Sequence, residues 1–272
     1  MSTPLYKRYC EFNINNRMLT SPPFALEFET EFSTKSSNQT TAIIYNPADD
    51  TVAACERKGS SYPKIIIDAG YEADYGTCVM GEIIKFEIKR QKDRVLKLLI
   101  TDKTSLWLNA KVNKSWKGAI DARSIITQIF SEFGITPGKI DLGVEKIYSR
   151  GVSFAGLPLS TAMKKLEQDT KSDFFFKNGQ ANFLKESGSI GAAFYLSPLT
   201  GLLSAEKFES TRKSGKTSKG YNVRTLFLYQ IGVGSLVQID GKQANGLFKV
   251  TKGKHKFSSR ASSGSEFEVI KL

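Results

Sequence analysis

His255 is the only histidine in the chain, so any Ser-His-Asp or Cys-His catalytic arrangement would have to use it. It lies within Lys252-Gly253-Lys254-His255-Lys256, which the sequence predicts as a basic turn. Neither a Gly-x-Ser-x-Gly elbow nor another recognisable nucleophile motif accompanies it. We therefore interpret His255 as a solvated or strand-packing residue and not as a catalytic base.

Other reactive patterns are equally incomplete. Gly215-Lys216-Thr217 matches the end of a phosphate-binding P-loop, but the glycine that the motif requires five positions earlier is Ser210. One histidine and three scattered cysteines provide no zinc-ligand spacing, and the odd number of cysteines predicts reduced thiols: Cys10, Cys55 and Cys78. Paired carboxylates for glycoside hydrolysis are recognised only by their separation in space, so the sequence leaves that alternative open. We expect no catalytic residue, metal site or cofactor.

Positive charge is concentrated near the C-terminus. Residues 205–272 carry 13 Lys/Arg against 5 Asp/Glu, whereas residues 1–104 carry 14 of each. The polar segment from Glu206 to Gly220, predicted as a long exposed loop, holds the candidate contacts with a partner or a channel lumen: Arg212, Lys213, Lys216 and Lys219. Because this segment lacks the interleaved aromatics of single-strand binders, it favours an acidic protein surface, or DNA contacted without sequence preference.

Similar β-rich segments lie at the two ends of the chain. Each has a β-branched run, a turn with Asp and Gly, a strand opened by Gly, a charged turn and a final strand. The first copy comprises Ile65–Ile67, a turn at Asp68–Tyr71, Gly81–Ile88, Lys89–Asp93 and Arg94–Ile100. The second comprises Leu236–Ile239, Asp240-Gly241, Gly246–Val250, the segment around His255 and Glu266–Ile270. We interpret them as a degenerate internal repeat of antiparallel meanders.

A further strand is predicted from residue 24 to residue 32, where apolar and acidic residues alternate. The residues expected to face the core are Phe24, Leu26, Phe28 and Phe32.

The middle of the chain has a different pattern. Apolar residues from Asp121 to Phe133 follow helical spacing, with Asp121 as a predicted N-cap and Gly134 as a left-handed terminator. A second helix is predicted from Ser160 to Thr170, capped by Ser160 or Thr161. Asn178-Gly179 between two apolar runs predicts a β-hairpin.

These elements predict a mainly β fold with an α+β middle, in which two similar antiparallel β-barrel domains flank a small α+β domain. The expected boundaries are a first barrel at 1–104, an α+β domain at 105–194 and a second barrel with a long basic loop at 195–272. No stretch near twenty apolar residues occurs, so no membrane span is expected. The start of the chain lacks the apolar core of a signal peptide, so we expect synthesis in the cytoplasm.

The order of three groups of motifs resembles the baseplate hub proteins of tailed bacteriophages and contractile injection machines. The first group is Ala42–Asn46, Lys64–Tyr71 and Gly81–Ile83; the second is Pro158–Leu166 with Asn178-Gly179; the third is Gly234–Ile239 and Gly246–His255. Together they span most of the chain. The resemblance implies a homotrimer in which each chain supplies two barrels. Six barrels then form a pseudo-hexameric ring that joins a six-fold tail tube to a three-fold central spike.

The resemblance further implies a structural protein of the virion tail baseplate, made in the host bacterial cytoplasm. Its expected partners are other copies of itself, the tail tube protein, the central spike protein and the tape-measure protein. Non-specific contact with DNA during ejection is also expected. Two alternatives of different classes remain at this stage. One is a peptidoglycan-degrading enzyme of the tail tip, and the other is a non-specific nucleic-acid-binding protein, motivated by the net charge of +12.

Overall fold

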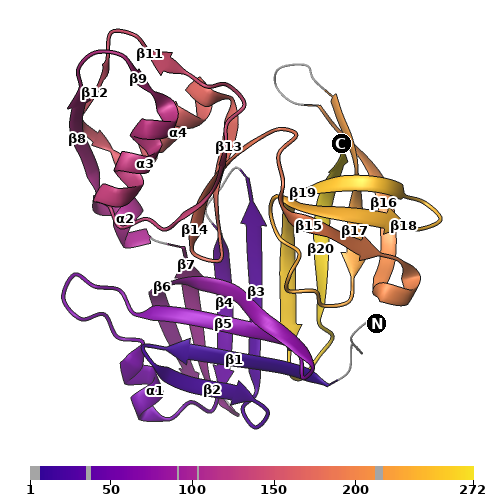
Figure 1. Cartoon of the computed structure of the whole chain (residues 1–272). Coiled ribbons are helices and arrows are strands. Elements are labelled where there is room, and N and C mark those ends of the chain that lie inside the picture. Colours follow the sequence, from indigo (N-terminus) through magenta and orange to yellow (C-terminus); the bar gives the residue numbers. More distant parts are fainter. Residues whose placement is uncertain (1–6, 35–37, 91, 103, 212–216) are drawn as a thin grey trace. The chain divides into compact units, whose positions relative to one another are not determined.

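The computed structural model describes residues 7–34, 38–90, 92–102, 104–211 and 217–272. Strands dominate, and the chain forms two compact units (Figure 1). Unit 1 comprises Met1–Ser33, Ser37–Asp102 and Ser189–Leu272, and unit 2 comprises Thr34–Ser36 and Lys103–Gly188. The predicted fold class, mainly β with an α+β middle, is confirmed. The exact division into three domains stays a prediction.

The first half of unit 1 contains five consecutive strands that we call repeat A. They are β3 (Leu26–Ser33), β4 (Gln39–Tyr45), β5 (Lys64–Tyr71), β6 (Asp74–Arg90) and β7 (Arg94–Thr101), and they lie in the sheet order β3-β4-β7-β6-β5. The hairpin of β1 (Arg8–Ile14) and β2 (Arg17–Ser21) continues the sheet beyond β5, and α1 (Asp49–Ala54) lies between β4 and β5 in the chain.

The last part of the chain contains five strands in the same arrangement, which we call repeat B. They are β16 (Leu202–Thr211), β17 (Thr217–Thr225), β18 (Ser235–Asp240), β19 (Asn245–Ser258) and β20 (Gly264–Lys271), in the order β16-β17-β20-β19-β18. β15 (Ile190–Leu196) pairs with β18 in parallel, and the 3-10 helix η1 (Pro198–Thr200) follows it. The predicted internal repeat is therefore present as a common strand order.

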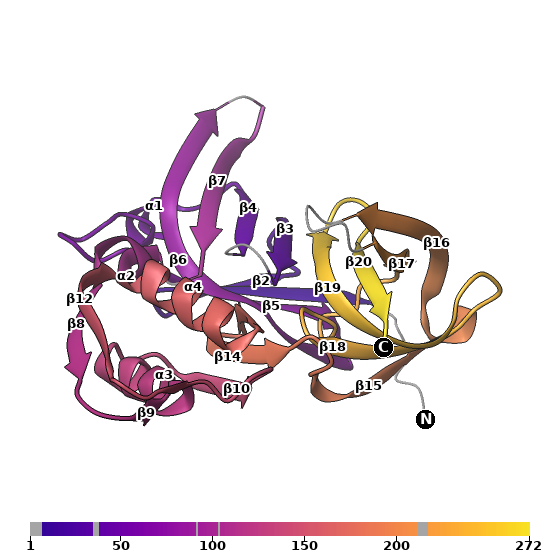
Figure 2. The same ribbon diagram turned by 90° about the horizontal axis from the view of Figure 1, so that it is seen from above.

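The two repeats are joined edge to edge. The second half of β19 pairs antiparallel with β3, from Lys252 opposite Ser33 to Ser258 opposite Glu27. One continuous sheet thus runs from β16 through β19 and β3 to β6 and then to β2. Figure 2 shows these strands in a row, with β16 at one end and the β6–β7 hairpin toward the other.

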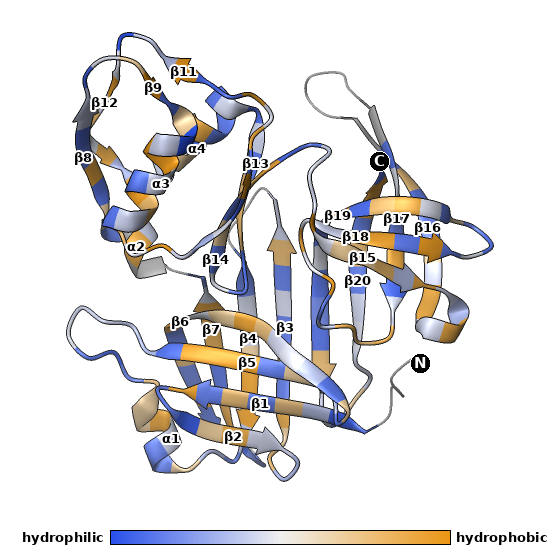
Figure 3. Cartoon of the chain, viewed as in Figure 1, coloured by the Kyte–Doolittle hydropathy of each residue, from blue (hydrophilic) through white to orange (hydrophobic). Residues whose placement is uncertain are grey.

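Alternation along the strands builds the core of unit 1. Along β3, Leu26 and Phe28 are buried while Glu31 is exposed, and Figure 3 shows this banding of polar and apolar residues. The core draws on β1 to β7 and also on Phe227 and Phe257 from the last part of the chain. Phe28 and Phe257 stack at 5.9 Å between ring centroids, so a hydrophobic contact reinforces the pairing of β3 with β19.

Unit 2 has its own core. Helices α3 (Ala122–Glu132) and α4 (Leu159–Thr170) bury one face each, among residues that include Ile126, Met163 and Phe183. The remaining elements are α2 (Thr104–Asn109), β8 (Lys111–Trp116), β9 (Ile120–Asp121), β10 (Pro137–Asp141), β11 (Ile147–Tyr148), β12 (Val152–Pro158), β13 (Ser172–Lys177) and β14 (Gln180–Lys185). The sheet order β10-β14-β13 contains the predicted hairpin, with Asn178 and Gly179 both at positive φ.

Local predictions in unit 2 are largely confirmed. The Asp121 side chain accepts a hydrogen bond from the Ser124 backbone nitrogen at 2.8 Å, and Gly134 has φ +59°. The predicted cap of the second helix is wrong, because Pro158 occupies the N-cap position and no side chain caps it. Lys171, in left-handed conformation, ends that helix.

Several predictions in unit 1 are wrong. Asp68–Tyr71 continues β5 instead of forming a turn, and the segment around His255 belongs to β19. Most of the predicted loop from Glu206 to Gly220 is a hairpin of β16 and β17. Phe24 precedes β3 and is 38% exposed, so it does not face the core. No helix among the described residues is long and apolar enough to cross a membrane.

Candidate functional site

The candidate basic contacts are only partly described. Lys219 lies on β17, and its Nζ forms an ion pair with Glu209 Oε1 on β16 at 3.2 Å, with both side chains exposed. Arg212, Lys213 and Lys216 lie outside the described residues. Because β16 pairs with β17, Lys219 lies on a hairpin. Its contact with a partner stays a prediction.

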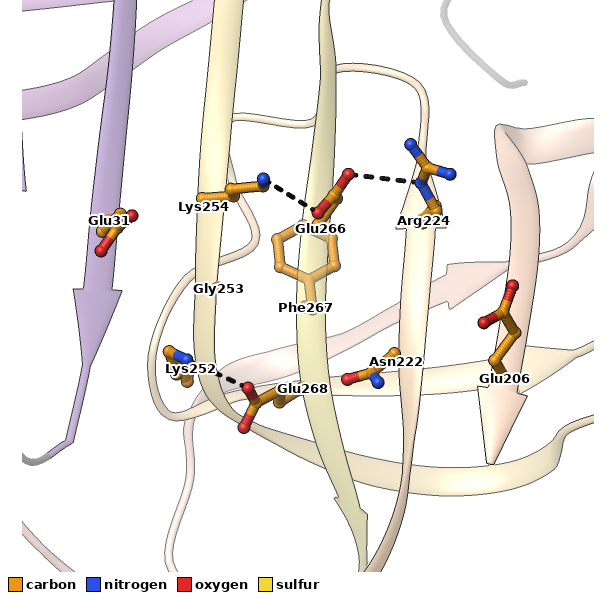
Figure 4. Close-up of a pocket in the computed structure, with 10 residues that line it drawn as sticks. All are labelled: Glu31, Glu206, Asn222, Arg224, Lys252, Gly253, Lys254, Glu266, Phe267 and Glu268. Atoms are coloured by element: carbon orange, nitrogen blue, oxygen red, sulfur yellow. Dashed lines mark hydrogen bonds and ion pairs between the residues drawn. The ribbon is translucent and has the colours of Figure 1, made fainter. Parts of the chain in front are cut away.

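The outer face of the sheet at the junction of the repeats carries alternating rows of charge. Strand alternation places Lys252 and Lys254 of β19 on this face, beside Glu266 and Glu268 of β20. Figure 4 shows these side chains around a shallow hollow, with Glu31 on β3, Glu206 on β16 and Arg224 on β17.

The carboxylates in the hollow are engaged by neighbouring cations. The Glu266 carboxylate forms ion pairs with Lys254 Nζ at 3.2 Å and with Arg224 Nε at 3.3 Å. Lys252 Nζ lies 3.2 Å from Glu268 Oε1. Each exposed pair is worth about 0–1 kcal/mol. An open hollow with ion-paired walls is unlike the mostly apolar concave pocket of a typical small-molecule site. The arrangement fits a wet, charged sheet surface.

His255 lies on the opposite face of β19, inside the core. It is 3% exposed, and its Nδ1 is 2.7 Å from the Ser265 hydroxyl. Its ring packs 4.9 Å from that of Phe32 and 5.6 Å from that of Phe227, measured between centroids. A catalytic serine must reach its substrate, whereas Ser265 is 1% exposed. The His255–Ser265 pair therefore packs strands, in agreement with the strand-packing alternative.

Cys10 and Cys55 are buried, and Cys78 is partly buried. Burial raises the pKa of Cys10 and Cys78 well above the ordinary thiol value and that of Cys55 to about 12, so these thiols stay protonated and weakly reactive. Within the described part of the chain no group of three His, Cys, Asp or Glu residues could hold a metal ion.

Besides the pairing of β3 with β19, side-chain hydrogen bonds also connect the two parts of unit 1. Asp74, at the start of β6, accepts hydrogen bonds from the Tyr229 hydroxyl at 2.8 Å and the Gln230 amide at 2.7 Å. Burial, followed by this hydrogen bond, raises the pKa of Tyr229 to about 12. The segment after β17 is thereby fixed against repeat A.

Within the two repeats, the outer edge of β16 and the second half of β6 carry no second ladder partner among the described residues, and the terminal strand β2 also pairs on one side only. β16 is the terminal strand of the sheet and pairs only with β17. β6 pairs with β5 up to Glu82, and from Lys85 to Arg90 it pairs only with β7. Unpaired edges are ready to accept another strand.

Comparison with solved structures assigns the fold. A tail protein from Neisseria meningitidis superposes with a TM-score of 0.70 at 9% identity, covering 98% of this chain and 97% of the other. A 43 kDa tail protein of prophage MuSo2 from Shewanella oneidensis gives 0.69 at 10% identity, covering 98% of both chains. The chain has the fold of phage tail proteins. No protein-family model matches it, and no curated protein matches it in sequence.

The same fold occurs in a secretion machine. An Escherichia coli component of the type VI secretion system, described as structurally similar to the bacteriophage T4 tail proteins gp27 and gp5, gives a TM-score of 0.64 at 12% identity. The match covers 91% of this chain and 73% of that protein. At such identities the likeness establishes the fold, and no function passes with it.

Sequence reasoning missed the charged face and the open edges of β16 and β6. A signal for the face was present, because acidic residues alternate along β3 and lysines alternate from Lys252 to Lys256. Two period-two strands of opposite charge are suited to lie side by side. The open edges had no such local signal, because whether a strand lies at an edge depends on how all the other strands pair.

Proposed function

We propose that this chain is a structural hub protein of a phage tail or of a related contractile injection machine. Three copies form a pseudo-hexameric ring that joins the six-fold tail tube to the three-fold central spike and lines the channel for DNA ejection. The observation that carries the proposal is the repeat itself: two five-strand sheets of the same order, joined edge to edge by β19 and β3.

Symmetry connects this observation to a ring. A chain with two equivalent repeats presents six repeats when three copies are related by a three-fold axis. Among the described residues, each copy keeps an uncovered edge in each repeat, at the second half of β6 in repeat A and at β16 in repeat B. Closing the ring would cover both edges, which removes the hazard of open-ended strand addition.

The charged outer face supports a channel lining. Glu29 and Glu31 of β3 lie beside Lys254 and Lys256 of β19, and charged residues continue onto β20 and β17. A surface with interspersed charges of both signs stays hydrated and offers no large patch of one sign for a polyanion to bind. Such a surface suits passing DNA better than retained DNA. The proposed location is therefore the virion tail, and no enzymatic step is assigned to the chain.

The proposed partners follow from the ring. One rim contacts the tail tube protein, the other contacts the central spike protein, and the tape-measure protein ends in the lumen. The basic hairpin with Lys219 is a candidate for an electrostatic contact with one of these partners or with DNA.

Native mass spectrometry and light scattering test the proposal, on the purified chain alone and mixed with the spike protein of the same particle. We expect a mass of three chains, or a complex of three chains with the spike. A chain that remains monomeric with the spike at high concentration would overturn the assignment. An assay on purified cell-wall material addresses the enzyme alternative, and we expect no release of soluble fragments.

A further inference from the structure

The ladders of the two repeats share one register shift, from which equivalent residues can be counted. Each has one long strand, β6 or β19, whose first half pairs with one strand of the repeat, β5 or β18, and whose second half stays paired with another, β7 or β20. Against β7, β6 has a register shift between Ile83 and Lys85; against β20, β19 has one between Val250 and Lys252. Aligning these shifts makes Lys85 equivalent to Lys252.

The alignment extends across four strands. In repeat A, Lys85 lies opposite Leu99, Leu99 opposite Thr41, and Thr41 opposite Glu29. In repeat B, Lys252 lies opposite Glu268, Glu268 opposite Asn222, and Asn222 opposite Glu206. Glu29 of β3 is therefore equivalent to Glu206 of β16. Four positions after the shifts, Lys89 of β6 is equivalent to Lys256 of β19.

The covered junction then serves as a template for the uncovered one. Within the chain the second half of β19 pairs with β3, and Lys256 lies opposite Glu29. The equivalents of these two strands are the second half of β6 and the outer edge of β16, and both lack a ladder partner among the described residues. Within one chain, six other strands lie between these two edges in the sheet order: β17, β20, β19, β3, β4 and β7. A second copy must therefore supply the partner.

We infer that the second half of β6 in one copy pairs antiparallel with the outer edge of β16 in the next copy, with Lys89 opposite Glu206. The inference rests on the proposed trimer and specifies the register by which its subunits join. It repeats between chains the contact that β19 and β3 make within one chain.

The exposed residues on these edges agree with the register. Residues 87–90 of β6 and Glu206 of β16 are solvent-exposed. In the proposed register, Glu87 of β6 lies opposite Phe208 of β16, because these residues are equivalent to Lys254 and Glu31 at the β19–β3 junction. Opposite charges therefore face each other only at Lys89 and Glu206. Apart from Glu87, 3.7 Å away, the described residues give Lys89 no ion-pair partner, and Glu206 has none. A cross-strand ion pair would satisfy both.

Disulfide trapping tests the register. Directly opposed residues in an antiparallel pair have Cα atoms about 4.5–5.5 Å apart, within the range that a disulfide spans. The Lys89→Cys/Glu206→Cys double variant should form covalent dimers and trimers under mild oxidation. Each single variant should remain a single chain on a non-reducing gel. The double variant Glu87→Cys/Glu206→Cys, two residues out of register, should crosslink much less.

A matched control comes from the template junction. Lys256→Cys/Glu29→Cys should form an intrachain disulfide with no increase in chain mass, which shows that the ladder geometry permits the bond. Circular dichroism of every variant checks that the sheet is retained.

Charge reversal tests the pair without a covalent bond. Lys89→Glu or Glu206→Lys should weaken trimer association by roughly 1.4- to fivefold per junction, the range of a cross-strand ion pair, and so by roughly three- to 150-fold over three junctions. Lys89→Glu with Glu206→Lys should restore most of the association. Rescue by the double reversal requires that the two residues face each other.

The outcomes separate this inference from the proposed function. Trimers trapped at Lys89 and Glu206, with rescue by the double reversal, would support the register. A wild-type trimer in which these cysteines do not crosslink would overturn the register and leave the hub assignment intact. A wild-type monomer with no crosslink, alone and with the spike, would overturn both.

Discussion

Replacing Phe28 by alanine should destabilise unit 1 strongly. Phe28 is 2% exposed, and its ring centroid lies 6.3 Å from that of Phe12, 6.1 Å from that of Phe227 and 5.9 Å from that of Phe257. A buried Phe→Ala change typically costs about 3–5 kcal/mol, and aromatic pairs are worth about 0.5–1.5 kcal/mol each beyond their buried area. With three such neighbours we expect a loss near 4 kcal/mol. That loss is nearly a thousandfold in the unfolding equilibrium constant.

Urea unfolding followed by far-ultraviolet circular dichroism measures this loss. The midpoint should fall by roughly 1–2 M at an m-value of about 2–3 kcal/mol per M. Both tryptophans, Trp107 and Trp116, lie in unit 2, whose core shares no residue with that of unit 1. Tryptophan fluorescence therefore reports on unit 2, and its transition should move less.

Phe24→Ala is the matched control, because it deletes the same side chain four residues earlier at a position that is 38% exposed. We expect it to change stability by no more than about 0.5 kcal/mol. Equal losses at Phe24 and Phe28 would refute the reasoning, since they would mean that the aromatic cluster shared by the two repeats contributes no more than an exposed ring.

Two further predictions concern unit 2. Asp121→Ala removes the cap of α3 and should cost about 1 kcal/mol by thermal or urea unfolding, whereas Ser160→Ala, at a helix start with no side-chain cap, should cost almost nothing. Burial lowers the pKa of Lys177 to about 8, from 10.5, so between these values the unfolded chain binds a proton that the folded chain has released. The stability of unit 2 should therefore rise from about pH 8 to pH 10. Lys177→Met should flatten the rise in urea unfolding followed by fluorescence, and an unchanged slope would contradict this assignment.

The sequence predicted what is decided by neighbouring residues. The helix after Asp121 and the Asn178-Gly179 hairpin depend on caps, spacing and turn residues within a few positions, and both are present. The common order of the repeats could also be read, because each repeat is a nearly continuous segment with its own turn signals.

Predictions failed where a distant strand decides the conformation. Gly70 was assigned to a turn, but it lies in β5, where an added Cβ would lie 2.4 Å from the Asp74 carbonyl oxygen. There the glycine allows close approach of two strands. The segment that forms the β16–β17 hairpin is predicted as a loop, because its residues are mostly polar and show no alternation of polar and apolar side chains. The segment from Lys252 to Lys256 is predicted as a basic turn, although it lies within β19, where strand alternation turns the His255 ring inward.

The pairing of β3 with β19 also imposes a delay during synthesis. Glu29 lies opposite Lys256, so about 227 residues must be translated before the partner position of Glu29 exists. At roughly 5–20 residues per second, the outer edge of β3 waits about 11–45 s on the ribosome. During this time the unpaired edge of β3 could pair with strands of other nascent chains. Glu27, Glu29 and Glu31 place three negative charges along it, and like charges oppose premature pairing between identical chains. The lysines of β19, synthesised near the end of the chain, then place positive charges beside these carboxylates.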